Sequence, residues 1–151
     1  VVLDPVFSSS SGGSLSTEEG IASLDTCLFP CVGLITPNLF EATRLVEQAG
    51  VQAESQEELA AACLNLGANA VLLKGGHYSG EQCTDLLVTD EEQTYSFSRK
   101  RIPGGSKVRG TGCRLASAIA CFQARGSELN EAVGQACEYL AGYISGRVDQ
   151  G

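Results

Sequence analysis

The sequence predicts an α/β fold in which helices flank a layered, mostly parallel central sheet, within a single domain spanning residues 1–151. Short apolar runs typical of buried strands alternate along the chain with segments whose apolar residues recur at helical spacing. The 151 residues, 43% of them hydrophobic and 19% charged, suffice for one core without disulfide bonds. No internal repeat and no linker divides the chain, so a single domain is expected.

The chain is expected to begin with a strand and a helix. The apolar run VVLDPV at residues 1–6 predicts a strand buried on both faces, which Asp4 ends. Residues 7–15 are rich in serine and glycine and predict a loop. Ser16 and Glu19 have the spacing of a capping box, which predicts the start of a helix. The apolar face of that helix would consist of Ile21, Leu24 and Leu28.

A strand and two further helices follow. The apolar segment 33–36 predicts the strand, and a helix is expected from Asn38 to about Ala49, where a glycine stops it. Ser55 and Glu58 form a second capping-box pattern, which predicts the next helix.

The second half of the chain is expected to hold three strands and two helices. Residues 70–74 predict another buried strand, whereas 84–89 and 94–102 alternate in polarity and predict a hairpin. A loop at 103–109 precedes the helices. Their faces would consist of Leu115, Ala118, Ile119 and Phe122, and of Leu129, Val133, Ala136, Leu140 and Ile144.

The composition excludes some classes of function. The net charge of -8 argues against a nucleic-acid backbone or an anionic membrane surface as the main partner, because both select basic surfaces. It leaves nucleotides open, since a phosphate needs only a few backbone N–H groups and one or two cations. No apolar run approaches the length that spans a bilayer.

The seven cysteines favour a reducing compartment, the cytoplasm. The count is odd, no signal peptide is present, and several cysteines fall at apolar positions of helical patterns. The chain has a single histidine, so the paired ligands of a structural zinc site are missing.

The stretch KVRGTGCR at residues 107–114 predicts an anion-binding site. Gly110 and Gly112 allow the backbone to turn sharply and approach a ligand, and the following helix directs its free N–H groups to the same place. At this helix end the dipole would favour the thiolate of Cys113, which makes it a candidate proton acceptor. The alternative is a glycine-rich loop capped by Thr111, with a thiol that only packs.

Three other motifs follow predicted strands. Asn38 and Glu41 could hold a hydrated Mg²⁺ beside phosphates, although the same pair also fits an ordinary capping box. Lys74, in the sequence KGGH, could neutralise phosphate charge, or it could be a solvated lysine in a glycine turn. Asp4 repeats the pattern after the first strand. Because ligands bind at the carboxyl ends of parallel strands, we expect these motifs and the anion-binding loop to converge.

The set DPV, TPNLFEA, KGGH and GTGC, in this order and spacing, resembles the hydroxymethylpyrimidine/phosphomethylpyrimidine kinases of thiamine biosynthesis, a branch of the ribokinase-like family. The likeness runs from Val1 to about Ile144. It implies a ribokinase-like layered sandwich and ATP- and Mg²⁺-dependent phosphorylation of 4-amino-5-hydroxymethyl-2-methylpyrimidine, of its monophosphate, or of both. It also implies that members of this family have a preceding segment that builds the pyrimidine pocket, and that residues 1–151 are the C-terminal, nucleotide-binding part.

The resemblance implies a role for each motif. The anion hole for the transferred phosphate would be formed by Gly110, Thr111 and Gly112, and Cys113 would accept the proton of the substrate hydroxyl. The nucleotide would be bound by Lys74, Gly75, Gly76 and Asn38, while Asp4 and Glu41 would organise Mg²⁺ and its waters.

Two other functions remain open. A pyridoxal kinase-like enzyme of the same branch uses a similar anion hole, and a non-catalytic domain could keep the fold and bind a nucleotide or pyrimidine without turnover. The expected partners are a small pyrimidine substrate and either a second copy of the chain or the missing N-terminal segment, because the first strand would otherwise present an unpaired edge. No nucleic acid and no membrane is expected among them.

Overall fold

The computed structural model describes residues 1–8, 12–76 and 80–148 and has the predicted α/β architecture. The strands are β1 (Val2–Leu3), β2 (Leu34–Ile35), β3 (Ala70–Leu73), β4 (Gln82–Thr89) and β5 (Thr94–Lys100). The helices are α1 (Glu18–Ala22), α2 (Leu24–Cys27), α3 (Leu39–Gln48), α4 (Gln56–Leu64), α5 (Thr111–Ala124) and α6 (Leu129–Val148), with short 3₁₀ turns η1 (Phe29–Cys31) and η2 (Gly105–Lys107).

Within the described residues the strands form one sheet in the order β1-β2-β3-β4-β5. β1, β2 and β3 are parallel, and β4 is antiparallel to both of its neighbours, β3 and β5. Four strands therefore run in one direction and β4 runs against them, which fits the expected mostly parallel sheet. The predicted hairpin is confirmed as β4 and β5. The carboxyl ends of β1, β2 and β3 consequently lie at the same edge.

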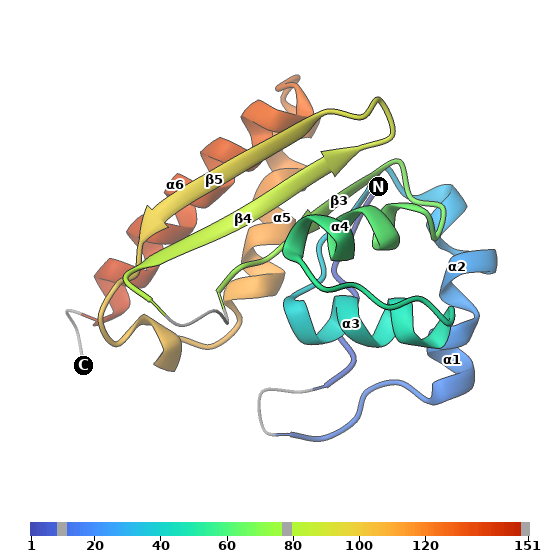
Figure 1. The fold of residues 1–151 in the computed structure, drawn as a ribbon. Helices are drawn as coiled ribbons and strands as arrows, with labels where there is room; N and C mark the ends of the chain where they lie inside the picture. The colour runs from blue at the N-terminus through green and yellow to red at the C-terminus, as the bar shows by residue number, and fades with distance from the viewer. Residues whose placement is uncertain (9–11, 77–79, 149–151) are drawn as a thin grey trace.

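Helices cover both faces of the sheet, with α3 and α4 on one side and α5 and α6 on the other (Figure 1). Alternation along the strands explains this arrangement. In β3, Val71 and Leu73 face the cluster beneath α3 and α4, and Ala70 and Leu72 face the cluster beneath α5 and α6. Because all four are buried, β3 reads in the sequence as a continuous apolar run.

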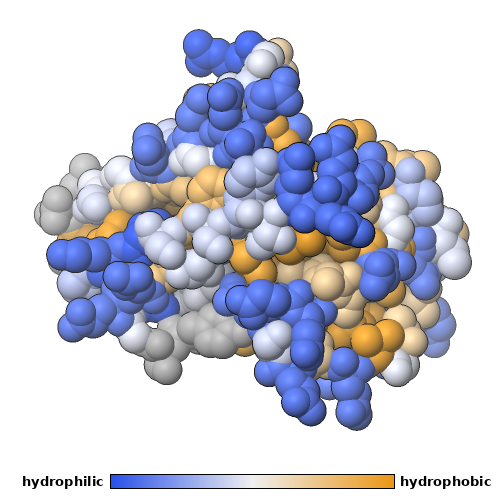
Figure 2. Space-filling view, turned by 45° about the horizontal axis from the view of Figure 1, so that its top comes forward, coloured by the Kyte–Doolittle hydropathy of each residue, from blue (hydrophilic) through white to orange (hydrophobic). Residues whose placement is uncertain are grey.

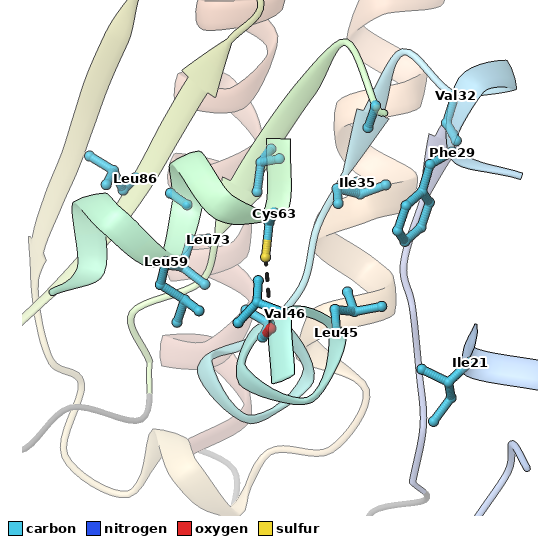
Figure 3. Close-up of a cluster of buried hydrophobic side chains, with 14 of the residues drawn as sticks. Ile21, Phe29, Val32, Ile35, Leu45, Val46, Leu59, Cys63, Leu73 and Leu86 are labelled. Atoms are coloured by element: carbon cyan, nitrogen blue, oxygen red, sulfur yellow. Dashed lines mark hydrogen bonds between the residues drawn. The ribbon is translucent and has the colours of Figure 1, made fainter. Parts of the chain in front are cut away.

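The core on the α3 and α4 side includes a buried thiol, Cys63. Its neighbours come from both helices and from the sheet, among them Val46, Leu59 and Leu73 (Figure 3). The thiol lies 3.8 Å from the carbonyl oxygen of Ala42, and burial raises the pKa of Cys63 to about 12. Cys63 therefore packs as a small apolar residue and holds its proton at neutral pH.

The first predicted helix differs from the structure in two ways. Its N-cap is Thr17 and not Ser16, because the Thr17 hydroxyl accepts a hydrogen bond from the Gly20 N–H group at 3.1 Å. The segment also divides at Ser23 into α1 and α2, and the Ser23 hydroxyl donates to the carbonyl oxygen of Gly20 at 2.9 Å. Leu28 then lies beyond both helices and is partly exposed.

The expectation that the first strand is buried on both faces is wrong. Val2 and Leu3 are only half-buried, and Val1 is exposed. Among the described residues β1 pairs with β2 alone, so one of its edges has no neighbouring strand. The unpaired edge is the one that the sequence analysis expected, whereas the burial of both faces, inferred from the apolar run alone, does not hold in this chain.

The face viewed in Figure 2 is largely hydrophilic, with smaller hydrophobic areas between the polar side chains. Within the described parts of the chain, none of the helices has both the length and the apolar character needed to cross a membrane.

Candidate functional site

The residues that follow β1, β2 and β3 meet at the carboxyl edge of the sheet. Thr36 N–H donates to the carbonyl oxygen of Leu3 at 2.9 Å, which ties the end of β2 to the end of β1. Lys74 N–H donates to the carbonyl oxygen of Pro37 at 2.9 Å, and Lys74 pairs with Asn38 in a parallel bridge. The backbone pairing of the strands thus continues into the site. It fixes the backbone positions from which the site side chains extend.

Lys74 is at the centre of a charged cluster. Its ammonium lies 2.8 Å from the Asp4 carboxylate and 3.9 Å from the Glu41 carboxylate. The three side chains are largely buried, with exposed fractions of 12% for Lys74, 11% for Asp4 and 8% for Glu41. Lys74 is therefore not a solvated lysine in a glycine turn. Two carboxylates against one ammonium leave one net negative charge when all three are ionised.

Glu41 also caps α3. The Glu41 carboxylate accepts a hydrogen bond from the Asn38 N–H group at 2.7 Å. The Asn38 side chain in turn accepts a hydrogen bond from the Glu41 N–H group at 3.0 Å. The prediction of a capping box at this motif is thus confirmed, and Glu41 also remains within 3.9 Å of the Lys74 ammonium. Burial raises the pKa of Glu41, and the charge of Asp4 adds to this, while the Asn38 bond and Lys74 partly offset the rise.

Thr36 is a site residue that the motif analysis missed. It is fully buried, and its hydroxyl donates to Asp4 Oδ1 at 3.3 Å, beside the Lys74 bond to the same oxygen. The orientation of Asp4 is therefore held by two donors. Thr36 is the first residue of the TPNLFEA motif, at the end of an otherwise apolar strand, and the sequence analysis assigned it no role.

The N-terminus of α5 lies against this cluster. Gly110 is the N-cap in the left-handed region, with φ 72°, and no side chain caps the first turn. A Cβ placed on Gly112 would lie 3.2 Å from the Lys74 ammonium and 3.6 Å from Asp4 Oδ2. A side chain at position 112 would crowd the Lys74 ammonium, so glycine favours the close approach of the helix end to Lys74. The result is a helix N-terminus, with its uncapped N–H groups, directly beside a buried cation.

Cys113 is exposed on the first turn of α5, and the expected lowering of its pKa is wrong for the chain as it stands. The Asp4 carboxylate, as the acceptor of its hydrogen bond, raises the pKa of Cys113; partial burial and the negative charge of Asp4 add to the rise. Lys74 and the backbone N–H of Cys113 lower the pKa, but by less. The position in sequence indicated a helix dipole and could not show the carboxylate opposite it.

The two glycines after Lys74 are engaged by the hairpin. Gly75 N–H donates to Asp85 Oδ1 at 2.8 Å, and the carbonyl oxygen of Gly76 accepts from Arg101 at 2.8 Å. Any contact of Gly75 with a phosphate therefore cannot use its N–H group. His77, the last residue of the KGGH motif, lies outside the described residues.

A surface hollow of about 500 Å³ begins at the N-terminus of α5 and follows its outer face. Gly110, Cys113 and Ser117 line it from α5 and its cap, and Tyr139 borders it from α6. A ligand that lies along this face can reach the exposed thiol of Cys113.

The structure thus brings together Asp4, Asn38, Glu41, Lys74, Gly110, Thr111, Gly112 and Cys113, the residues of all four motifs. Within the described residues no group of three or more His, Cys, Asp or Glu side chains is arranged to hold a metal ion by itself.

Comparison with protein families gives a match over the whole chain. The family model described as phosphomethylpyrimidine kinase matches residues 1–151. A hydroxymethylpyrimidine/phosphomethylpyrimidine kinase of Aquifex aeolicus is 39% identical over 140 residues, which cover 93% of this chain and 54% of that protein. The counterpart in Escherichia coli is 36% identical, with coverage of 96% and 54%. The chain spans about half the length of these relatives and corresponds to their C-terminal part.

Solved structures give the same architecture. The phosphomethylpyrimidine kinase of Clostridium difficile has a TM-score of 0.70 at 34% identity, covering 95% of this chain and 56% of that one. The pyridoxal kinase of Staphylococcus aureus in complex with AMP-PCP and pyridoxal has a TM-score of 0.76 at 26% identity, with coverage of 93% and 49%. The ribokinase-like fold is therefore that of this chain.

Asp4→Asn should increase the alkylation rate of Cys113 at pH 7.5. The change removes the charge that raises the thiol pKa and leaves Lys74, which lowers it, so the thiolate fraction rises. A fall of one pKa unit gives about a tenfold rise in thiolate, and we expect a rate increase of about three- to tenfold with iodoacetamide.

Peptide-resolved mass spectrometry measures the rate at each cysteine. Cys121, which is exposed on the same helix, is the internal control and should react equally in both proteins. An unchanged or slower reaction at Cys113 would show that Asp4 does not govern its protonation.

Proposed function

Because the chain belongs to the phosphomethylpyrimidine kinase family, we propose that it is the nucleotide-binding part of an ATP-dependent kinase. The substrate of the whole enzyme is 4-amino-5-hydroxymethyl-2-methylpyrimidine, its monophosphate, or both. One observation carries the proposal: the glycine end of α5 packs against the buried ammonium of Lys74, with the Cys113 thiol on the same turn. Phosphoryl transfer to a hydroxyl uses phosphate-binding donors, positive charge and a proton acceptor, and these three groups can supply them in one place.

The phosphate chain is bound by the N-terminus of α5 and by Lys74. The first-turn N–H groups after Gly110 face outward without a side-chain cap, and they attract the oxygens of the transferred phosphoryl group. Lys74 stabilises the charge that builds up on those oxygens. Gly112 keeps these donors close together, because a side chain there would press on the Lys74 ammonium.

The donor set at the strand ends fits Mg²⁺. Asp4 and Glu41 supply carboxylate oxygens, which Mg²⁺ prefers, and the ion usually keeps several waters and phosphate oxygens as its other ligands. Two carboxylates against the single ammonium of Lys74 leave a negative charge that disfavours a free triphosphate. When bound, the cation supplies the charge neutralisation that phosphoryl transfer requires.

Cys113 accepts the proton of the substrate hydroxyl late in the reaction. In the ligand-free chain Asp4 keeps its pKa raised, so the group is a protonated thiol at neutral pH. Engaging Asp4 in the nucleotide complex removes its hydrogen bond to the thiol and neutralises its charge, which lowers that pKa and makes the thiolate available. Asp4 thereby couples phosphate binding to the protonation of Cys113, the proposed general base.

A pyridoxal kinase-like activity is the second candidate. The observation in its favour is the pyridoxal kinase of S. aureus in complex with pyridoxal, with a TM-score of 0.79 at 25% identity. The higher identity to the phosphomethylpyrimidine kinases favours the pyrimidine substrate. A non-catalytic binding domain is the third candidate, and a turnover assay distinguishes it from both.

We place the enzyme in the cytoplasm. All seven cysteines are free thiols, and three of them are buried in the core. A reducing compartment keeps the exposed ones in that state.

The outer edge of β1 is expected to pair with another strand, from a second copy or from the N-terminal segment found in the relatives. The backbone N–H and C=O groups on this outer edge do not pair with β2, and a sheet edge of this kind associates readily with another strand. Light scattering on the purified chain should give a mass above that of the 15.7 kDa monomer. Addition of a peptide with the missing N-terminal strands should then change that mass. A strictly monomeric chain that ignores the peptide would contradict this proposal.

The kinase activity is tested with Cys113→Ala in the protein extended to the full length of its relatives. Turnover of hydroxymethylpyrimidine, followed by coupled ADP release, should fall by about 10²-fold or more, the usual effect of losing a general base. Nucleotide affinity should stay nearly unchanged, because the base does not contact the distal phosphates.

Cys121→Ala on the same helix is the matched control and should retain the parental rate. Full turnover by the Cys113 variant would reduce the thiol to a packing role. Nucleotide binding without turnover in the parental protein would favour the non-catalytic domain.

A further inference from the structure

Asp85 is an almost completely buried carboxylate outside the cluster around Lys74. It lies on β4 with an exposed fraction of 1%, on the face of the sheet covered by α5 and α6. In the ladder between β3 and β4, Leu73 pairs with Leu86, so the same register carried one step further places Lys74 opposite Asp85. The buried Asp85 carboxylate therefore lies beside the backbone from which the Lys74 side chain extends.

The two oxygens of Asp85 have different partners. Oδ1 accepts the N–H group of Gly75 at 2.8 Å. Oδ2 accepts from Arg99 Nη1 at 2.7 Å and lies 3.7 Å from the thiol of Cys137. Burial, with the charge of Asp85, raises the pKa of Cys137 to about 12, so this thiol keeps its proton. Arg99 balances the charge of Asp85, and Oδ1 remains for Gly75 alone.

Gly75 is fixed between the site and the hairpin. A Cβ on Gly75 would lie 1.8 Å from the carbonyl oxygen of Thr84, so the backbone after Lys74 runs directly against β4. Without an acceptor at residue 85, the Gly75 N–H group would be buried and unpaired, which is unfavourable and drives a local shift. Lys74 immediately precedes this residue, so such a shift moves its ammonium.

We propose that Asp85 is a positioning residue for Lys74: by holding the N–H group of Gly75 it fixes the direction in which the Lys74 side chain enters the cluster with Asp4 and Glu41. Arg99 makes this possible, because a buried carboxylate needs an opposite charge beside it, and Arg99 supplies that charge. The consequence for ATP rests on the proposed function, whereas the consequence for the Lys74 ion pair does not.

Two double variants separate positioning from stability. Asp85→Leu with Arg99→Met replaces the ion pair by apolar groups, which is often close to neutral for stability, and removes the acceptor of Gly75. Asp85→Asn with Arg99→Met keeps an amide oxygen for Gly75.

The first measurement is by NMR on the chain without nucleotide. The Asp85→Leu, Arg99→Met variant should lose the exchange protection of the Gly75 amide by about tenfold or more, and the ammonium signal of Lys74 should shift to that of a solvated lysine. The Asp85→Asn, Arg99→Met variant should keep both parental signals. If the leucine variant does not fold, Asp85→Ala with Arg99→Met makes the same comparison.

The second measurement is calorimetric binding of ATP and adenosine to the same proteins. The leucine variant should bind ATP about tenfold more weakly and adenosine within about twofold of the parental affinity, and the asparagine variant should restore ATP binding. A parental chain that binds no ATP contradicts the proposed function but leaves the NMR comparison decisive. A parental Lys74 signal in the leucine variant overturns the proposal.

Discussion

The ion pair between Lys74 and Asp4 is the interaction on which the rest of the site depends. It joins the ends of β1 and β3 across β2 at 2.8 Å, with both side chains largely buried. A buried pair of this kind is stable only when its other hydrogen-bonding positions are filled. Thr36 fills one on Asp4, and Glu41 lies on the other side of Lys74, so each motif supports its neighbours.

The ion pair between Lys74 and Asp4 also affects the protonation of Cys113. Asp4 is bonded to Lys74 and raises the pKa of Cys113, so any ligand that changes the balance around Asp4 also changes the thiol. Gly112 favours this coupling, since a side chain there would crowd the Lys74 ammonium where α5 approaches it. Under the proposed function, nucleotide binding and proton acceptance are two effects of one cluster, beside the helix N-terminus proposed to bind the phosphate.

Much of the fold could be predicted because apolar periodicity reflects burial on either face of a sheet. The hairpin, the two layers of helices and the convergence of the strand ends follow from it. The unpaired edge of β1 was expected as well, but the partial exposure of its side chains and the division of the first helix at Ser23 were not, since both depend on what lies beside them in space. The motifs gave Asp4, Lys74 and Cys113, but not the raised pKa of the thiol, which requires knowing that Asp4 stands opposite it. Asp85 was missed because it lies within a strand pattern and belongs to no motif, and Thr36, although it opens the TPNLFEA motif, was assigned no role because nothing in the sequence places its hydroxyl beside Asp4.

The most direct test of this account is the affinity of the chain for ATP and for adenosine in the presence of Mg²⁺, compared between the parental protein and Lys74→Met. The variant keeps most of the apolar stem and removes the charge. ATP binding should weaken by about tenfold or more and adenosine binding should change little, because a charge-assisted bond to a phosphate contributes about 1.5–3 kcal/mol. Lys100→Met, at an exposed lysine of β5, should leave both affinities unchanged. Equal weakening for both ligands, or unchanged ATP binding, would contradict the central place of Lys74.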